Sequence, residues 1–227
     1  KSQPNESVNM IYCDILYGTG RNFGDYQDLK PIRSKIESHY LPRLIEMKRV
    51  LKRNGSIYLQ MDTRINHWMR ILMDEVFGYG NFKNEIVWTY RSGGGSKNKF
   101  GQKHDVIIYY AMPKAIFNVL REPYSAVIAN KRKHLFYDDG KALGDSWDIN
   151  LLSTVSKERL GYPTQKPKEL IRRFVLASTN EGDVVADYYL GSGTTAKVCQ
   201  ELNRNFIGCD INPKAIEITK ARLNDGQ

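Results

Sequence analysis

Residues 183–211 read DVVADYYLGSGTTAKVCQELNRNFIGCDI, and this stretch decides the fold. Its apolar start predicts a buried strand that ends at Asp187, and the glycines of Gly191-Ser192-Gly193 predict a tight turn into a helix. Roughly twenty residues past that turn, a second strand ends at Asp210. A strand, a glycine turn, a helix and another strand form the repeating unit of a doubly wound α/β sheet.

The two acids and the glycine turn indicate a mononucleotide-type site. Asp210 is placed to accept hydrogen bonds from ribose hydroxyls, and the turn lets a ligand approach the backbone. The stretch lacks the third glycine of a dinucleotide fingerprint and the Lys-Ser/Thr pair of a Walker A loop. Because Asp187 would repel phosphate, a ligand with an ammonium or sulfonium group fits better, and S-adenosylmethionine carries both. An ordinary glycine-rich turn remains the alternative.

Strands and helices alternate through the rest of the chain. We expect strands that end at Asp14 and span 56–62, 84–90 and 104–112, and helices over 34–53, 64–77, 166–179 and 212–223. This order predicts an α/β fold with a doubly wound, mostly parallel sheet. Residues 1–112 form the first half of the core, 113–150 a small insertion, and 151–227 the second half with the glycine turn.

Positive charge is concentrated in the middle of the chain. The net charge is +9, and the segment from Arg91 to Lys141 holds ten Lys and Arg against four acids. Within it, residues 91–103 (RSGGGSKNKFGQK) combine three consecutive glycines with four basic residues, which predicts a mobile basic loop. A polyanionic partner accounts for this pattern better than a plain solvated face does.

Cysteine usage and hydropathy exclude several classes of protein. Cys13, Cys199 and Cys209 are scattered without a CxxC pair, which argues for a reducing cytoplasm and against a zinc site or disulfide framework. No apolar run approaches the ~20 residues of a membrane span, and the polar N-terminal residues do not resemble a secretory signal. We therefore expect no metal, no membrane and a cytoplasmic location.

Six segments together resemble a known family. IYCDILYGTG (11–20) aligns with a D-P-P-Y catalytic motif, and GSIYLQMD (55–62) and KHDVIIYYA (103–111) match the core strands after it. GYPTQKPKELIRRFVLAST (161–179) precedes DYYLGSGTT (187–195) and FIGCDINP (206–213), which match the cofactor motifs. The chain resembles the β-class amino methyltransferases of DNA, which methylate adenine N6 or cytosine N4, many of them in restriction–modification systems. TQKP followed by GSGTT is the strongest of these signals.

The resemblance implies a Rossmann-like S-adenosylmethionine-dependent methyltransferase that acts on a base flipped out of double-stranded DNA. Asp14 and the Ile15 carbonyl would accept the hydrogens of the target amino group, for which we expect adenine N6, and Tyr17 would stack on the base. The implied cofactor-binding residues are Thr164, Gln165, Lys166, Pro167, Asp187, Tyr188, Leu190, Gly191, Ser192, Gly193, Thr194, Thr195, Asp210 and Ile211. The implied DNA-binding residues are Arg91, Lys97, Lys99, Lys103, His104, Lys131, Arg132 and Lys133. A bacterial, nucleoid-associated protein follows, with a homodimer or a restriction subunit as further partners.

The sequence departs from this family at the catalytic motif. Ile15 and Leu16 replace its two prolines, and DYY replaces the more usual D-P-F before the glycine turn. Because prolines restrict the backbone, we expect a looser catalytic loop. Alternatives to an active adenine enzyme are a weakened or silent DNA-binding subunit and a cytosine-N4 enzyme. An RNA amino methyltransferase or a small-molecule enzyme on the same fold also remains open.

Overall fold

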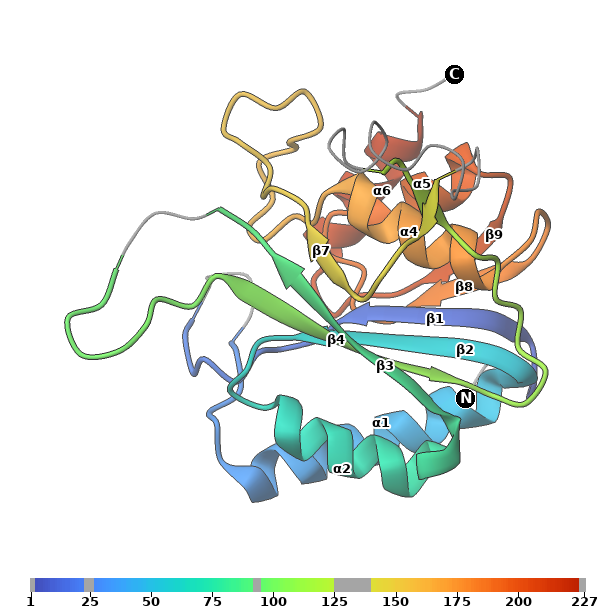
Figure 1. Cartoon of the computed structure of the whole chain (residues 1–227), viewed down its shortest axis with the longest axis horizontal. Coiled ribbons are helices and arrows are strands. Elements are labelled where there is room, and N and C mark those ends of the chain that lie inside the picture. The colour runs from blue at the N-terminus through green and yellow to red at the C-terminus, as the bar shows by residue number, and fades with distance from the viewer. Residues whose placement is uncertain (1–2, 23–26, 92–94, 125–139, 225–227) are drawn as a thin grey trace.

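One seven-stranded sheet organises the molecule, with the strand order β7-β3-β4-β2-β1-β8-β9 (Figure 1). The computed structural model describes residues 3–22, 27–91, 95–124 and 140–224. The strands of this sheet are β1 Val8–Asp14, β2 Leu51–Met61, β3 Phe82–Thr89, β4 His104–Ala111, β7 Ser146–Asp148, β8 Val184–Asp187 and β9 Asn205–Gly208. Two short strands, β5 Arg121–Glu122 and β6 Lys141–Ala142, pair separately.

Most neighbouring strands run parallel. β1 lies parallel to β2 on one side and to β8 on the other, and β8 lies parallel to β9. β4 alone is reversed, because it pairs antiparallel with both β2 and β3, and β7 is parallel to β3. The predicted doubly wound, mostly parallel sheet is confirmed. Its consequence is that β1, β8 and β9 all end at the same edge of the sheet.

Helices cover both faces of the sheet (Figure 1). α1 Arg33–Val50 and α2 Asn66–Phe77 lie on one face, and α4 Lys168–Ser178, α5 Thr194–Glu201 and α6 Pro213–Asn224 lie on the other. A short 3₁₀ helix, η1 Tyr79–Asn81, leads into β3. None of the helices in the described parts of the chain is long and apolar enough to cross a bilayer.

Helix α4 shows how the sequence attaches a helix to the sheet. Leu170, Ile171, Phe174 and Val175 recur at helical spacing and are at most 1% exposed. The Phe174 ring lies 5.3 Å from the ring of Tyr12 in β1, measured between centroids. Burying side chains of this size stabilises the fold by about 1.5–3 kcal/mol each. Because α4 is anchored to β1, the segment just before it is held close to the end of that strand.

The boundary between α1 and β2 differs from the prediction. α1 ends at Val50 and β2 begins at Leu51, whereas we expected a helix to residue 53 and a strand from 56. The register with β1 shifts here, so that Val8 pairs with Leu51 but Met10 pairs with Ser56. A Cβ atom on Gly55 would lie 2.6 Å from a methyl group of Leu51. Gly55 therefore permits a bulge inside the strand and does not end a helix.

The predicted insertion at 113–150 is partly core. Ser146–Asp148 form the edge strand β7 beside β3, and Trp147 is only 6% exposed. The indole nitrogen of Trp88 donates to the carbonyl oxygen of Ile149 at 2.7 Å, which ties this segment to the sheet. The expectation that 113–150 lies outside the core layers is therefore wrong for its last residues. Lys131, Arg132 and Lys133 lie outside the described residues.

Candidate active site

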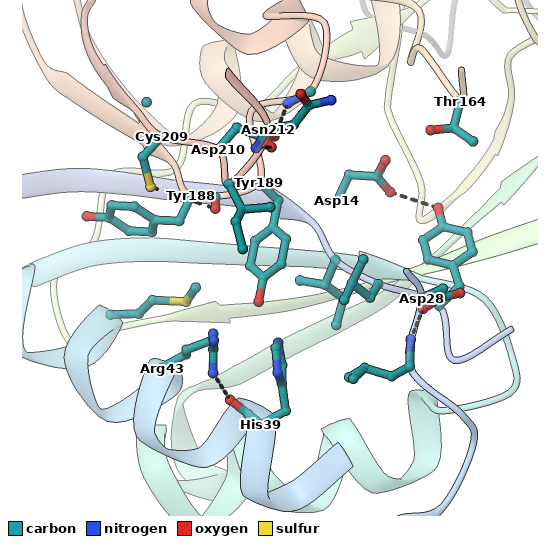
Figure 2. Close-up of a pocket in the computed structure, with 18 of the residues that line it drawn as sticks. Asp14, Asp28, His39, Arg43, Thr164, Tyr188, Tyr189, Cys209, Asp210 and Asn212 are labelled. Carbon is teal, nitrogen blue, oxygen red and sulfur yellow. Dashed lines mark hydrogen bonds between the residues drawn. The ribbon is translucent and has the colours of Figure 1, made fainter. Parts of the chain in front are cut away.

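A cavity of about 1230 Å³ opens where β1, β8 and β9 end (Figure 2). Its lining includes Asp14, Tyr17, Thr164, Gly191 and Asp210, which come from both halves of the chain. Figure 2 shows Asp14 and Thr164 toward one end of this cavity, with Tyr188 and Cys209 toward the other. Two loops that are far apart in the sequence thus share one cavity, as expected at the carboxyl ends of parallel strands.

Asp14 is the last residue of β1, and its side chain is held by two donors. The Tyr17 hydroxyl donates to Asp14 Oδ1 at 2.8 Å, and the Lys166 ammonium pairs with Asp14 Oδ2. Burial raises the pKa of the Asp14 carboxyl, while Lys166 and Tyr17 act to lower it and the nearby charge of Asp105 adds to the increase. Asp14 is therefore a carboxylate whose ionisation depends on its neighbours.

The loop after Asp14 is held by hydrogen bonds in place of prolines. Ile15 is buried, and its N–H donates to the carbonyl oxygen of Gln60 at 3.1 Å. The Tyr40 hydroxyl donates to the Leu16 carbonyl at 3.0 Å. Farther along, the buried carboxylate of Asp28 accepts the backbone N–H groups of Gly18 and Thr19, at 3.1 and 2.7 Å. The structure thus gives this loop several restraints that the sequence did not reveal.

The glycine turn is fastened to the end of β8 by Asp187. Its carboxylate accepts the Tyr189 N–H at 3.0 Å and the Thr195 hydroxyl at 2.6 Å, so it links β8 to the first turn of α5. Asp187 is 3% exposed, and this burial, together with the charges of Asp14 and Asp210, raises its pKa to about 7. Both of its oxygens are engaged in holding the turn.

Asp210 follows β9, lies against the glycine turn and keeps acceptor capacity. Its carboxylate accepts the N–H of Gly191 at 2.8 Å and the N–H of Asn212 at 2.9 Å, one on each oxygen. A carboxylate offers about four acceptor positions, so two remain for hydroxyl donors. Next to it, Ile211 is 92% exposed, and the buried amide nitrogen of Asn212 has no hydrogen-bond partner among the described residues. This donor and acceptor set fits a ribose and an attached base.

The TQKP segment is divided between the cavity and the scaffold. Thr164 and Lys166 line the cavity, whereas the Gln165 side chain accepts from the Leu160 N–H at 2.9 Å and donates to the Glu158 carbonyl at 2.7 Å. Pro167 is buried directly before α4. The Thr194 hydroxyl donates to the Lys166 carbonyl at 3.1 Å and joins the segment to the glycine turn.

The remaining predicted cofactor residues also differ in their environment. The Tyr188 hydroxyl donates a hydrogen bond to Gln3 Oε1 at 2.7 Å, and Leu190 packs against Gly208 of β9. Ser192 is buried, and its carbonyl accepts from Arg222 of α6 at 3.1 Å. Gly193 adopts a left-handed conformation with φ of 72°. Leu190, Ser192 and Gly193 shape the turn, whereas Tyr188, Gly191, Asp210 and Ile211 line the cavity.

The predicted DNA-binding residues that the structure describes lie in the connection between β3 and β4 and at the first residue of β4. Arg91, Lys97 and Lys99 are exposed, and Lys103 and His104 are half-buried where the chain enters β4. β3 runs in the same direction as β1, so this loop emerges on the side of the cavity (Figure 1). The Phe100 side chain between these basic residues is 100% exposed.

Sequence reasoning missed two polar residues next to Asp14. Asp105 and Gln60, both in core strands, contact the Tyr17 hydroxyl. The available signals were Asp105 directly before the apolar run VIIYYA (106–111) and Gln60 inside the apolar run IYLQM (57–61). In the described parts of the chain, no group of three or more His, Cys, Asp or Glu residues is placed to hold a metal ion.

Curated proteins of bacterial origin are similar to the chain over almost its full length. It is 34% identical to the type II methyltransferase M.HpaI of Haemophilus parainfluenzae, over 99% of this chain and 70% of that protein. It is 31% identical to the DNA adenine methyltransferase YhdJ of Escherichia coli K12, over 99% of this chain and 79% of that protein.

Solved structures share the fold. The M1.HpyAVI complex with S-adenosylmethionine aligns with a TM-score of 0.67 and 21% identity, over 96% of this chain and 89% of that one. The cytosine-N4-specific PvuII DNA methyltransferase aligns with a TM-score of 0.70 and 16% identity, over 100% and 83%. The sequence profile of the N6/N4 DNA methylases matches residues 8–221, and the chain therefore belongs to this DNA methylase family.

Proposed function

We propose that the protein transfers a methyl group from S-adenosylmethionine to the exocyclic amino group of a base in DNA, and that this base is adenine. The observation that carries the proposal is that Asp14 and Asp210 line one cavity although they come from opposite ends of the chain. One acid would hold the amino group of the base and the other the ribose of the cofactor. A methyltransferase needs both at the same time, because methyl donor and acceptor must be oriented toward each other.

The cofactor would lie along the glycine turn. Asp210 would accept the two ribose hydroxyls with its free acceptor positions, and Ile211 would cover one face of the purine. The amide nitrogen of Asn212, which has no partner within the described part of the chain, would donate to the same ligand. S-adenosylmethionine, when bound, supplies a methyl group activated by its sulfonium.

The target base would dock at Asp14. An ionised Asp14 would accept one hydrogen of the amino group and the Ile15 carbonyl the other, while the Tyr17 ring stacks on the base. Lys166 supports this role because its positive charge favours the ionised form of Asp14. The residues orient the amino nitrogen and stabilise developing positive charge, and no covalent intermediate with the protein is required.

Adenine is favoured over cytosine by the residue at position 14. In the family that the chain resembles, cytosine enzymes more often carry Ser where this chain has Asp14. YhdJ, which is named as an adenine methyltransferase, is similar over 99% of the chain. Ile15 and Leu16 do not argue strongly for a silent protein, because the loop is restrained by Gln60, Tyr40 and Asp28.

DNA would bind over the loop that follows β3. Its exposed basic residues suit phosphate contacts, and the exposed Phe100 ring suits stacking or insertion between bases. The same loop leads into β4, whose second residue, Asp105, lies beside Tyr17. The DNA-binding surface would therefore adjoin the pocket that receives the flipped base.

The test is to incubate the protein with S-adenosylmethionine labelled in the methyl group and bacterial DNA from an unmethylated strain. Hydrolysis to nucleosides and mass spectrometry then identify the product. N6-methyladenine supports the proposal, and its absence with Asp14→Ala supports the role of Asp14. Labelled N4-methylcytosine would overturn the adenine assignment. Normal cofactor and DNA binding without any transfer would show a silent subunit.

A further inference from the structure

A polar cluster lies directly behind Asp14, where β2 and β4 meet the catalytic loop. Its centre is Asp105 of β4, which is 5% exposed. Asp105 accepts hydrogen bonds from the Tyr17 hydroxyl at 2.7 Å, the Tyr90 hydroxyl at 3.0 Å and Gln60 Nε2 at 3.2 Å. None of the ion pairs between described residues involves Asp105. Three neutral groups thus lie within hydrogen-bond distance of a buried carboxylate beside the site.

The Tyr17 hydroxyl lies between two carboxylates. Its oxygen is 2.8 Å from Asp14 Oδ1 and 2.7 Å from Asp105 Oδ2. A hydroxyl carries one proton, so it donates to only one of these acceptors at a time. Burial, with the charges of Asp14 and Asp105, raises the pKa of Tyr17 well above its usual value, so the hydroxyl keeps its proton. Two arrangements follow, which differ only in the direction of one O–H bond.

Gln60 fixes the remaining side of this hydroxyl. Its Oε1 accepts from the Tyr12 hydroxyl at 2.7 Å, which directs its amide nitrogen toward the Tyr17 oxygen at 3.0 Å. Gln60 is fully buried in β2, so this orientation is held by the core. Because Gln60 occupies a lone pair of the Tyr17 oxygen, the proton is left as the only part of the hydroxyl that can change partner.

We propose that Asp105 is a positioning residue that takes the Tyr17 hydrogen bond when the amino group of the target base docks on Asp14. The inference rests on the proposed function. While Tyr17 donates to Asp14, it draws charge from the oxygen that must accept the amino hydrogen. When the hydroxyl turns to Asp105, Asp14 Oδ1 becomes the stronger acceptor. Both O···O distances are already short, so the change requires no displacement of heavy atoms.

The test replaces Asp105 by its neutral isostere. In Asp105→Asn, an amide oxygen competes poorly with the Asp14 carboxylate, and the hydroxyl stays on Asp14. We expect the single-turnover rate of methyl transfer to fall about tenfold, the size of one charge-assisted hydrogen bond, with unchanged cofactor and DNA affinity. The rate of methyl transfer should fall at low pH as Asp14 becomes protonated, and we call this fall the acid limb of the pH–rate profile. In Asp105→Asn we expect the acid limb to move to lower pH, because the charge of Asp105 helps to raise the pKa of Asp14.

Removing the Tyr17 hydroxyl tests whether Asp105 acts by accepting its hydrogen bond or only supports the structure. Tyr17→Phe keeps the ring but has no proton to leave on Asp14, so the double variant Tyr17→Phe, Asp105→Asn should transfer faster than Asp105→Asn alone. A double variant that is as slow as Asp105→Asn, or slower, would overturn the inference. So would an acid limb that does not move in Asp105→Asn.

Two further variants complete the design. If thermal unfolding shows that Asp105→Asn is not folded, Tyr90→Phe replaces it. That change removes a donor from Asp105, strengthens its hold on Tyr17 and should leave the rate at or above that of the parent; a lower rate would contradict the inference. Asp74→Asn is the matched control, because Asp74 accepts from Tyr110 of the same strand β4, away from the cavity. Its rate and acid limb should not change. Full activity of Asp14→Ala would instead reject the proposed function itself.

Discussion

The ammonium of Lys166 lies on the carboxylate of Asp14, although 152 residues separate the two in the chain. Lys166 is held before α4, and Asp14 ends β1, so the ion pair joins the two halves of the core. The side chain of Lys166 is only 11% exposed and that of Asp14 only 21% exposed. Solvent therefore screens this pair weakly, and the charge of Lys166 acts directly on the residue that we propose to be catalytic.

Replacing Lys166 by Met should move the acid limb of methyl transfer to higher pH. Lys166 is the largest influence that lowers the pKa of Asp14, and without it burial and Asp105 raise that pKa unopposed by a cation. Since Asp14 must be ionised to accept the amino hydrogen, activity should disappear at a higher pH than in the parent. An opposite charge at this range is worth about one to three pH units.

The measurement is the single-turnover rate between pH 5 and pH 9, with DNA and cofactor saturating. Lys168→Met is the control, because Lys168 is two residues away and pairs with Glu201 on the surface. Its acid limb should match that of the parent. An unchanged acid limb in Lys166→Met would show that the ion pair does not control the ionisation of Asp14.

Cofactor binding should release protons near neutral pH. In the free protein the pKa of Asp187 is raised to about 7, so about half of these carboxyl groups carry a proton at pH 7. A cationic ligand nearby lowers that pKa, because it favours the charged form, and up to about half a proton should leave. Calorimetric titration with S-adenosylmethionine in buffers of different ionisation enthalpy measures this number.

Asp187→Asn provides the control for that experiment. An Asn side chain can still accept from the Tyr189 N–H and can donate to the Thr195 hydroxyl, which also acts as an acceptor. The turn should therefore keep its shape while the titrating group is lost. Binding enthalpies that depend on the buffer as strongly in Asp187→Asn as in the parent would assign the proton to another residue.

The parts of the fold that were predicted from sequence are those that depend on local pattern. The glycine turn and its two acids lie within residues 183–211, and helical spacing within α4 is enough to predict which face is buried. The β2 start was missed because Gly55 allows a bulge, and a glycine after a helix usually marks its end. β7 was missed because three residues with one buried Trp do not make a strand pattern.

The site was harder to predict where it depends on pairing between distant strands. Lys166 reaches Asp14 because β1 pairs with β8 and because α4 packs on β1. The residues of the TQKP segment alone predict neither of these contacts. Within that segment the φ of Thr164 is 59°, and Gln165 holds residues 158–160 instead of facing the cavity. Asp105 was missed because a lone acid at the start of a strand is common.

Gly193→Ala should destabilise the protein and uncouple α5 from α6. Gly193 has a φ of 72°, and a Cβ atom there would lie 2.4 Å from Thr219 Oγ1 and 2.6 Å from its methyl group. Left-handed strain and overpacking together should cost about 2–4 kcal/mol. Chemical denaturation gives the free energy of unfolding of parent and variant.

A second substitution tests whether the close approach is the cause. The Thr219 hydroxyl is buried without a partner among the described residues, so Thr219→Ala alone should cost little. Combined with Gly193→Ala it removes the two closest atoms, and the double variant should recover part of the lost stability. Equal instability of Gly193→Ala and the double variant would show that only backbone strain matters there.

The loop after β3 should contact DNA through separate electrostatic and stacking contributions. Lys97 and Lys99 are exposed on either side of residue 98, and Phe100 next to them is fully exposed. Changing both lysines to Gln should reduce the slope of log K against log salt by about 0.9 per lost phosphate contact. Phe100→Ala should weaken binding by about 1–3 kcal/mol and leave that slope unchanged, because stacking involves no counterion release.

Fluorescence anisotropy on duplex DNA at several salt concentrations measures both quantities. Lys83→Gln serves as a basic control outside the loop, at the other end of β3, and should alter neither. A parent slope retained in the double lysine variant would remove this loop from the DNA interface.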